Sequence, residues 1–170
     1  MTIDLREAIA ADLTELTAIY NHYVSTTHAC FDIEPFTVEQ RQDWISHYRP
    51  TGPHRLVVAV EQSAVVGYAS STTFRPKPAY STTVATSVYC TPAAVGRGIG
   101  SMLYERLFAL IADEDLHRAV AGITLPNEES LRLHRRFGFT DIGIEHEVGR
   151  KFGRFWDVLL LERSLPYEPS

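Results

Sequence analysis

The feature that most constrains this chain is a strand, a glycine-spaced turn and a helix in direct succession, in the segment VYCTPAAVGRGIGSMLYERL. Gly96, Gly98 and Gly100 alternate immediately before the helical pattern begins. Without Cβ atoms this backbone can bend sharply and aim several N–H groups at one point, where the helix dipole adds positive charge. The turn is therefore a candidate anion site that would fit a diphosphate, with Arg97 and the Ser101 hydroxyl beside it.

A structural turn without a ligand is the competing interpretation, because alternating glycines alone are a weak signal. The turn is not a P-loop, since no Gly-Lys-Ser/Thr follows it. It is also a poor dinucleotide fingerprint, because the strand before it belongs to a predicted meander and not to a βαβ unit. The choice between a structural turn and an anion site depends on the rest of the chain.

Strand and helix patterns alternate along the sequence and predict an α+β fold, a largely antiparallel sheet with helices on both faces. Thr37 and Gln40 form a predicted capping box at the start of the second helix. In chain order the predicted elements are a strand (3–8), a helix (12–25), a helix (37–48), a three-stranded meander (55–90), a helix (98–112), a strand (119–125), a helix (128–137) and two strands (140–149 and 155–164).

Size and composition predict one domain over residues 1–165 with a short tail at 166–170, because 170 residues with 45% hydrophobic side chains suffice for a single core. A net charge of −5 gives no overall attraction for nucleic acid or an anionic membrane. Cys30 and Cys90 form neither a disulfide framework nor a metal-binding pattern. Because no metal-binding pattern is present, we expect no metal ion. We find no membrane span or signal segment, and therefore expect a cytoplasmic protein.

Four segments, in this order, resemble the GCN5-related N-acetyltransferases (GNAT), and within them the phosphinothricin and methionine sulfoximine acetyltransferase branch. They are IYNHYVSTTHACFDIEP, then TTVATSVYCTP leading into GRGIGS, then LPNEESLRLHRRFGF, and finally GRFWDV. The resemblance runs from Leu5 to Leu165. It implies a GNAT fold of about six to seven strands, splayed at an acetyl-CoA site. It also implies a homodimer that acetylates a small amino-acid-like amine by direct attack in a ternary complex.

The resemblance places the coenzyme on the glycine turn and on the strand before it, where the pantetheine arm would pair like an added strand. Asn127 would bond to this arm or cap the following helix. Val95 stands where the family usually has Gln or Arg, so we expect weaker or repositioned contacts there. The implied coenzyme-binding residues are Val88, Tyr89, Cys90, Val95, Gly96, Arg97, Gly98, Ile99, Gly100, Ser101, Asn127 and Ser130.

The family comparison leaves the proton acceptor open, because Ala85 stands where this branch carries its general-base glutamate. His28, Glu34 and His134 are the candidate substitutes. His134 is also a candidate proton donor to the leaving thiolate, or else a packed, hydrogen-bonded residue. The loss of the glutamate keeps a second function in view, an acyl-CoA-binding module without catalysis. Covalent catalysis by Cys90 is disfavoured, since its strand position favours burial.

The acceptor pocket is also only partly specified. Arg75 and Lys77 would bind an acceptor carboxylate, or form a solvated basic loop. Glu34 lines the acceptor pocket in the resemblance and is otherwise a solvated loop carboxylate. Trp156 replaces a histidine of the branch, which puts its acceptor specificity in doubt. The candidate apolar walls, or alternatively core residues, are Phe31, Phe74 and Tyr80.

Overall fold

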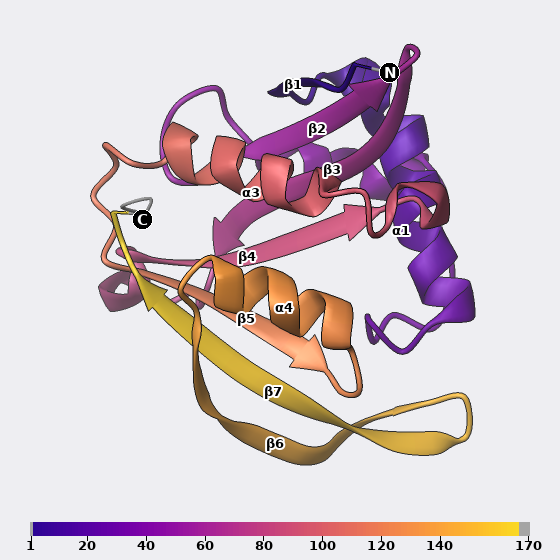
Figure 1. The fold of residues 1–170 in the computed structure, drawn as a ribbon, viewed down its shortest axis with the longest axis vertical. Coiled ribbons are helices and arrows are strands. Elements are labelled where there is room, and N and C mark those ends of the chain that lie inside the picture. Colours follow the sequence, from indigo (N-terminus) through magenta and orange to yellow (C-terminus); the bar gives the residue numbers. More distant parts are fainter. Residues whose placement is uncertain (1, 167–170) are drawn as a thin grey trace.

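A seven-stranded sheet with helices on both faces organises the chain (Figure 1). The structure is a computed structural model and describes residues 2–166, so that the predicted tail lies outside the described residues except for Pro166. The strands are β1 (Asp4–Glu7), β2 (Leu56–Glu61), β3 (Ala64–Thr73), β4 (Thr83–Cys90), β5 (Arg118–Thr124), β6 (Thr140–Lys151) and β7 (Arg154–Ser164). The α-helices are α1 (Leu13–Thr26), α2 (Gln42–Ser46), α3 (Ile99–Leu110) and α4 (Glu128–Arg136).

The strands follow the order β1-β2-β3-β4-β5-β7-β6 across the sheet. Every neighbouring pair is antiparallel except β4 and β5, which run parallel. This arrangement confirms the predicted meander (β2, β3 and β4) and the mixed, mostly antiparallel sheet. Among the described helices, none is long and apolar enough to cross a membrane.

One face of the sheet, which we call the front face, is covered by α3 and α4 (Figure 1). Alternate strand residues such as Val84, Ala121 and Leu159 point to this face and are buried. They pack against the apolar stripe of α3, including Leu103 and Leu107, in one continuous core. The 3.6-residue apolar period of α3 thus meets the two-residue period of the strands, as the sequence predicts.

The opposite face, the back face, is covered by α1 and α2 over the meander only. Leu16 and Ile19 of α1 pack there on Val58 and Tyr68. Farther along the sheet, the back-face side chains of β5 and β7 are only half-buried: Val120, Val158 and Leu160. The back face therefore has a covered half and an open half, and the boundary between them runs along β4 and β5.

The predicted helix over residues 37–48 is shorter than expected. Its capping box forms, with the Thr37 N–H donating to Gln40 Oε1 at 2.8 Å and the Gln40 N–H donating to Thr37 Oγ1 at 3.3 Å. A 3₁₀ turn (Glu39–Arg41) and the single-turn α2 then follow. The last N–H groups bond three residues back, which prevents the helix from continuing to Tyr48.

The junction of β1 with α1 supplies a stability prediction. Asp12 is buried and accepts two hydrogen bonds of 2.7 Å from Arg6 and one of 2.8 Å from the Ile9 N–H. Burial alone would raise the pKa of Asp12, but these bonds outweigh it and hold the pKa below its ordinary value. We expect Asp12→Asn to lower the free energy of unfolding at neutral pH by about 1–2 kcal/mol.

The pH dependence of this effect follows from the lowered pKa of Asp12. A carboxyl group with a lowered pKa stabilises the fold above its unfolded pKa, and that contribution disappears as the pH falls through its folded pKa. The difference between wild type and Asp12→Asn in urea unfolding should therefore shrink in acid. Asp141→Asn is the control, because Asp141 forms only an exposed pair with Arg135 at 3.7 Å. A difference that persists unchanged in acid would contradict the assigned role of Asp12.

Candidate active site

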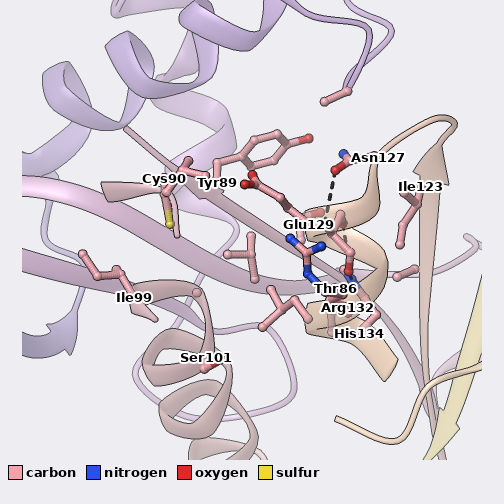
Figure 2. A pocket seen from close by; sticks show the side chains of 18 of the residues that line it. Thr86, Tyr89, Cys90, Ile99, Ser101, Ile123, Asn127, Glu129, Arg132 and His134 are labelled. Carbon is pink, nitrogen blue, oxygen red and sulfur yellow. Dashed lines mark hydrogen bonds between the residues drawn. The ribbon is translucent and has the colours of Figure 1, made fainter. Parts of the chain in front are cut away.

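The central feature of the site is a slot through the sheet between β4 and β5. The two strands pair only from Thr83 to Ala85 on β4, against Arg118 to Val120 on β5, and then diverge. A pocket of about 430 Å³ occupies the gap (Figure 2). It is lined by front-face residues such as Ile123 and by back-face residues such as Ser87 and Gly122, so the slot reaches both faces. The splay predicted for the sheet is thus present.

The glycine turn closes the front end of this slot. Gly96 and Gly98 have φ values of +77° and +79°, a conformation that side chains rarely adopt, and open space lies where their Cβ atoms would be. α3 begins directly afterwards at Ile99, and Gly96, Gly98 and Ser101 all line the pocket. Helix N-termini carry N–H groups without intrahelical partners, so this cradle suits an anionic group.

Arg97 does not join the cradle in this structure, contrary to the expectation that it reinforces the anion site. Its guanidinium donates two hydrogen bonds to the Glu61 carboxylate, at 2.6 and 3.0 Å, on the far side of the turn. This bidentate pair satisfies the charge locally. The positive potential of the turn therefore comes from the backbone and the helix dipole.

Helix α4 contributes pocket residues that sequence reasoning missed. Glu129, Arg132 and Arg136 line the pocket, and Figure 2 shows Glu129 and Arg132 projecting into it toward Tyr89. The three-residue and four-residue spacings place these side chains on one helix face, a signal that is readable in the sequence. Thr86 is a further missed residue, on β4 immediately after the point where the strands separate.

Asn127 fills the capping role considered for it, and it also stands at the pocket where a bond to the coenzyme arm was expected. Its Oδ1 accepts a hydrogen bond from the Ser130 N–H at 3.2 Å, which caps α4, and the residue also lines the pocket (Figure 2). A capping side chain is fixed in orientation. Asn127 therefore offers a rigid polar group at the edge of the slot.

His134 lies inside the front wall of the pocket, buried and hydrogen-bonded through both ring nitrogens. Nδ1 donates to the Ser130 carbonyl at 2.7 Å, so Nε2 accepts from the Tyr104 hydroxyl at 2.8 Å. Burial lowers the pKa of His134, which keeps the ring neutral. The packed, hydrogen-bonded interpretation describes this geometry, and neither nitrogen is free to exchange a proton with a ligand.

Cys90 carries an inert thiol. It is buried, and burial raises its pKa to about 11, so that at neutral pH the thiolate nucleophile is almost absent. The described residues contain no group of three or more His, Cys, Asp or Glu side chains placed to hold a metal ion. The slot therefore acts on its ligands through backbone groups, hydroxyls, the Asn127 amide and the charges on α4.

Comparison with known proteins identifies this arrangement. The family model described as Acetyltransferase (GNAT) family matches residues 16–139. The chain belongs to the GNAT acetyltransferase family. It is 54% identical to a phosphinothricin N-acetyltransferase of Streptomyces coelicolor, over 96% of each chain. It is 36% identical to an L-methionine sulfoximine/L-methionine sulfone acetyltransferase of Pseudomonas aeruginosa, over 97% of this chain and 96% of the relative.

Solved structures agree with the sequence comparison. A GNAT-superfamily phosphinothricin acetyltransferase from Sinorhizobium meliloti, solved in complex with acetyl-CoA, superposes with a TM-score of 0.91 at 32% identity and covers all of this chain and 94% of that one. This GNAT enzyme is thus an acetyl-CoA-dependent N-acetyltransferase. The alternative of a binding module without catalysis finds no support among relatives named as acetyltransferases.

Acetyl-CoA fits the residues of the slot. The Gly96 to Ser101 cradle would hold the pyrophosphate, and the unpaired β4 edge beyond Ala85 offers N–H and C=O groups to the amides of the arm. When bound, acetyl-CoA supplies an activated acetyl group. Val95, exposed at the rim, would offer the phosphates only its backbone.

The candidate acceptor residues fall into two groups. Near the back mouth, Phe31 packs against Gly149 of β6, and the His28 ring stacks on Trp156 of β7 with 4.2 Å between ring centroids. The buried Lys151 ammonium donates to the Cys30 carbonyl at 2.9 Å, which ties this loop to the hairpin of β6 and β7. Ala29 of the same loop lines the slot.

The other group lies elsewhere. The Arg75 guanidinium sits 4.7 Å from the Phe74 ring and donates to the Tyr80 hydroxyl at 3.2 Å, in the exposed loop between β3 and β4 that also holds Lys77. This loop adjoins the start of β4, whereas the pocket adjoins its end. Glu34 is exposed as well. Within residues 2–166, none of these five side chains lines the slot.

A glycine substitution tests the anion cradle. Gly98→Ala places a side chain in a left-handed conformation, at a cost of about 1–2 kcal/mol. We expect the Kd of coenzyme A, measured by titration calorimetry, to rise by about tenfold. Gly98→Asn should have a smaller effect, because Asn tolerates this conformation.

Gly153→Ala is the matched control for Gly98→Ala. Gly153 has a φ of +73° in the turn between β6 and β7, away from the cradle. It should lower stability by a similar amount and leave the Kd of coenzyme A within twofold of wild type. Equal Kd values for Gly98→Ala and wild type would show that the turn does not hold the coenzyme.

Proposed function

We propose that this GNAT enzyme acetylates the amine of small amino-acid-like acceptors of the phosphinothricin and methionine sulfoximine type. The observation that carries the proposal is the slot through the sheet, with an anion cradle at its front end and an open back mouth. The names of relatives that match almost the whole chain support the acceptor class. Another relative, 34% identical over 96% of this chain, is an L-amino acid N-acyltransferase of Escherichia coli.

Direct transfer between two bound substrates suits this geometry. The coenzyme occupies the front and middle of the slot, and the back mouth remains for the acceptor. A covalent acetyl-cysteine step would need a thiolate, but Cys90 is a buried thiol with a raised pKa. Backbone N–H groups between Val88 and Cys90 would polarise the thioester carbonyl, since β5 does not pair with them.

Thiol release from acetyl-CoA tests the proposal directly. The panel comprises phosphinothricin, methionine sulfoximine, methionine sulfone, ordinary amino acids and polyamines, each with purified protein. We expect turnover with the first three compounds and less with ordinary amino acids and polyamines. The matching relatives are named for acetylation of phosphinothricin, methionine sulfoximine and methionine sulfone. Turnover confined to polyamines, or none at all in a folded protein that binds coenzyme A, would contradict the proposed acceptor class.

We also propose that the enzyme is a cytoplasmic homodimer. Its two cysteines are free, which suits a reducing compartment. The edge strand β6 and its hairpin expose large apolar side chains, including Ile142, Ile144 and Phe155, and an uncovered edge of this kind favours association.

Light scattering on a sizing column tests the dimer. Ile144→Glu should shift the mass from dimer to monomer, because it places a charge in the proposed interface. Ile9→Glu is the control, since Ile9 is also exposed but lies beside β1 at the other edge of the sheet. A monomeric wild-type protein, or a dimer unaffected by Ile144→Glu, would rule out this interface.

A further inference from the structure

The acceptor side of the slot lies on the back face, and this placement rests on the proposed function. Ala85 pairs with Val120 on β5 and Thr72 on β3, and alternation along β4 places Ser87 on the same face as Ala85. Across the sheet, the antiparallel register of β5 with β7 continues this face to Val158, and alternation along β7 carries it to Trp156. The front face is filled by α3 and α4.

The back face requires a group that removes a proton from the acceptor, because an ammonium nitrogen has no lone pair for attack. The Ala85 methyl group cannot accept one. The tyrosines that line this side, Tyr23 and Tyr89, have pKa values raised by burial, so their hydroxyls stay protonated. His134 is on the front face with both nitrogens occupied. Its buried ring therefore cannot substitute for the missing carboxylate.

His28 has the orientation that a base needs. Its ring lies flat on the Trp156 indole, with an interplanar angle of 4°, and Nε2 lies 2.8 Å from the Pro126 carbonyl oxygen. A carbonyl only accepts hydrogen bonds, so Nε2 must carry a proton, and the neutral form of the ring then has its lone pair on Nδ1. Among the described residues, no hydrogen bond to this Nδ1 is present.

The neighbours of His28 place it at the back mouth. The next residue, Ala29, lines the slot, and Pro126, whose carbonyl binds Nε2, directly precedes the slot residue Asn127. Trp156 and Pro126 also border a second hollow, which Arg154 and Asp157 line as well. His28 thus follows the slot in sequence through Ala29 and contacts two residues of the adjoining hollow, Pro126 and Trp156.

We infer that His28 is the general base of this enzyme, with Trp156 and the Pro126 carbonyl holding its ring in place. An acceptor N–H bond breaks, and its proton passes to the Nδ1 lone pair. The freed nitrogen lone pair forms the C–N bond to the acetyl carbon, and the C–S bond breaks with its electrons leaving on sulfur. The thiolate takes up the second nitrogen-bound proton, and His28 later releases its own proton to solvent.

Two substitutions separate basicity from packing. His28→Phe keeps a flat ring on Trp156 but has no nitrogen, and His28→Gln keeps an N–H donor for the Pro126 carbonyl but is no base. We expect both to lower kcat/KM for phosphinothricin by about 10²–10⁴-fold. The Kd of coenzyme A should stay within twofold. The residual rate should rise about tenfold per pH unit until the pH reaches the pKa of the acceptor amine, because solvent then supplies the deprotonated amine.

His22→Phe and His22→Gln are the matched controls, since His22 is also half-buried and its described ring contact and hydrogen bonds are with Tyr23 and Thr26 of α1. Both should retain kcat/KM within twofold. Nitrogen NMR of labelled histidine adds a readout without turnover, in which His28 should show the Nε2–H tautomer.

The outcomes distinguish the inference from the proposed function. Wild-type activity in His28→Phe, or an Nδ1–H tautomer for His28, would overturn the inference and leave the acetyltransferase assignment intact. A wild-type protein that acetylates none of the panel would overturn the proposed acceptor class and, with it, the role of His28. Loss of activity in both His28 variants but in neither His22 variant is the expected result.

Discussion

The parting of β4 from β5 after Ala85 and Val120 is the constraint on which the rest of the structure depends. Up to that point the strands form an ordinary parallel ladder, and beyond it their backbone groups face a slot. Side chains stabilise the branch point where the ladder ends. The Thr86 hydroxyl reaches back to the Val120 carbonyl at 3.4 Å, and the Tyr104 hydroxyl, 3.1 Å from Thr86, joins α3 to the same place. His134 completes the chain from α4. This buried network replaces the missing ladder bonds with contacts from both front-face helices, which gives His134 a structural role.

Periodicity and turn chemistry predicted most of the fold, because the apolar stripes of α1 and α3, the continuous apolar run of β2 and the alternation in β4 and β5 are local patterns that the final core reinforces. The prediction was wrong for the length of the second helix, where the capping box was correct but the chain tightened into 3₁₀ bonding. Element boundaries of this kind depend on tertiary contacts. The Arg41 guanidinium, for example, packs 3.8 Å from the Trp44 ring centre, which a sequence pattern does not specify.

The sequence predicted the backbone features of the site better than its side-chain contacts, for a physical reason. The glycine turn is visible in sequence because left-handed backbone demands glycine at Gly96 and Gly98. Side-chain partners are not encoded in the same way. Nothing near Arg97 in the sequence indicates that Glu61 binds it across the β2–β3 turn, and nothing near His28 indicates that its ring rests on Trp156. Residues chosen by family position, such as Arg75 and Lys77, lie by the opposite end of β4 from the slot.

The Lys151 ammonium links several segments on the acceptor side of the slot. It is buried, and its described hydrogen-bond acceptors are the carbonyls of Cys30 and Tyr23 together with the Cys30 sulfur, while the Lys151 carbonyl accepts from the Trp156 indole. The end of α1, the loop that carries His28 and the start of the β7 strand are thereby joined through one residue, the first two by its side chain and the third by its backbone carbonyl. The loop that carries His28 is therefore fastened to the end of β6. If two copies associate through the β6 edge as proposed, their contact would lie on the same hairpin that holds the His28 loop in place.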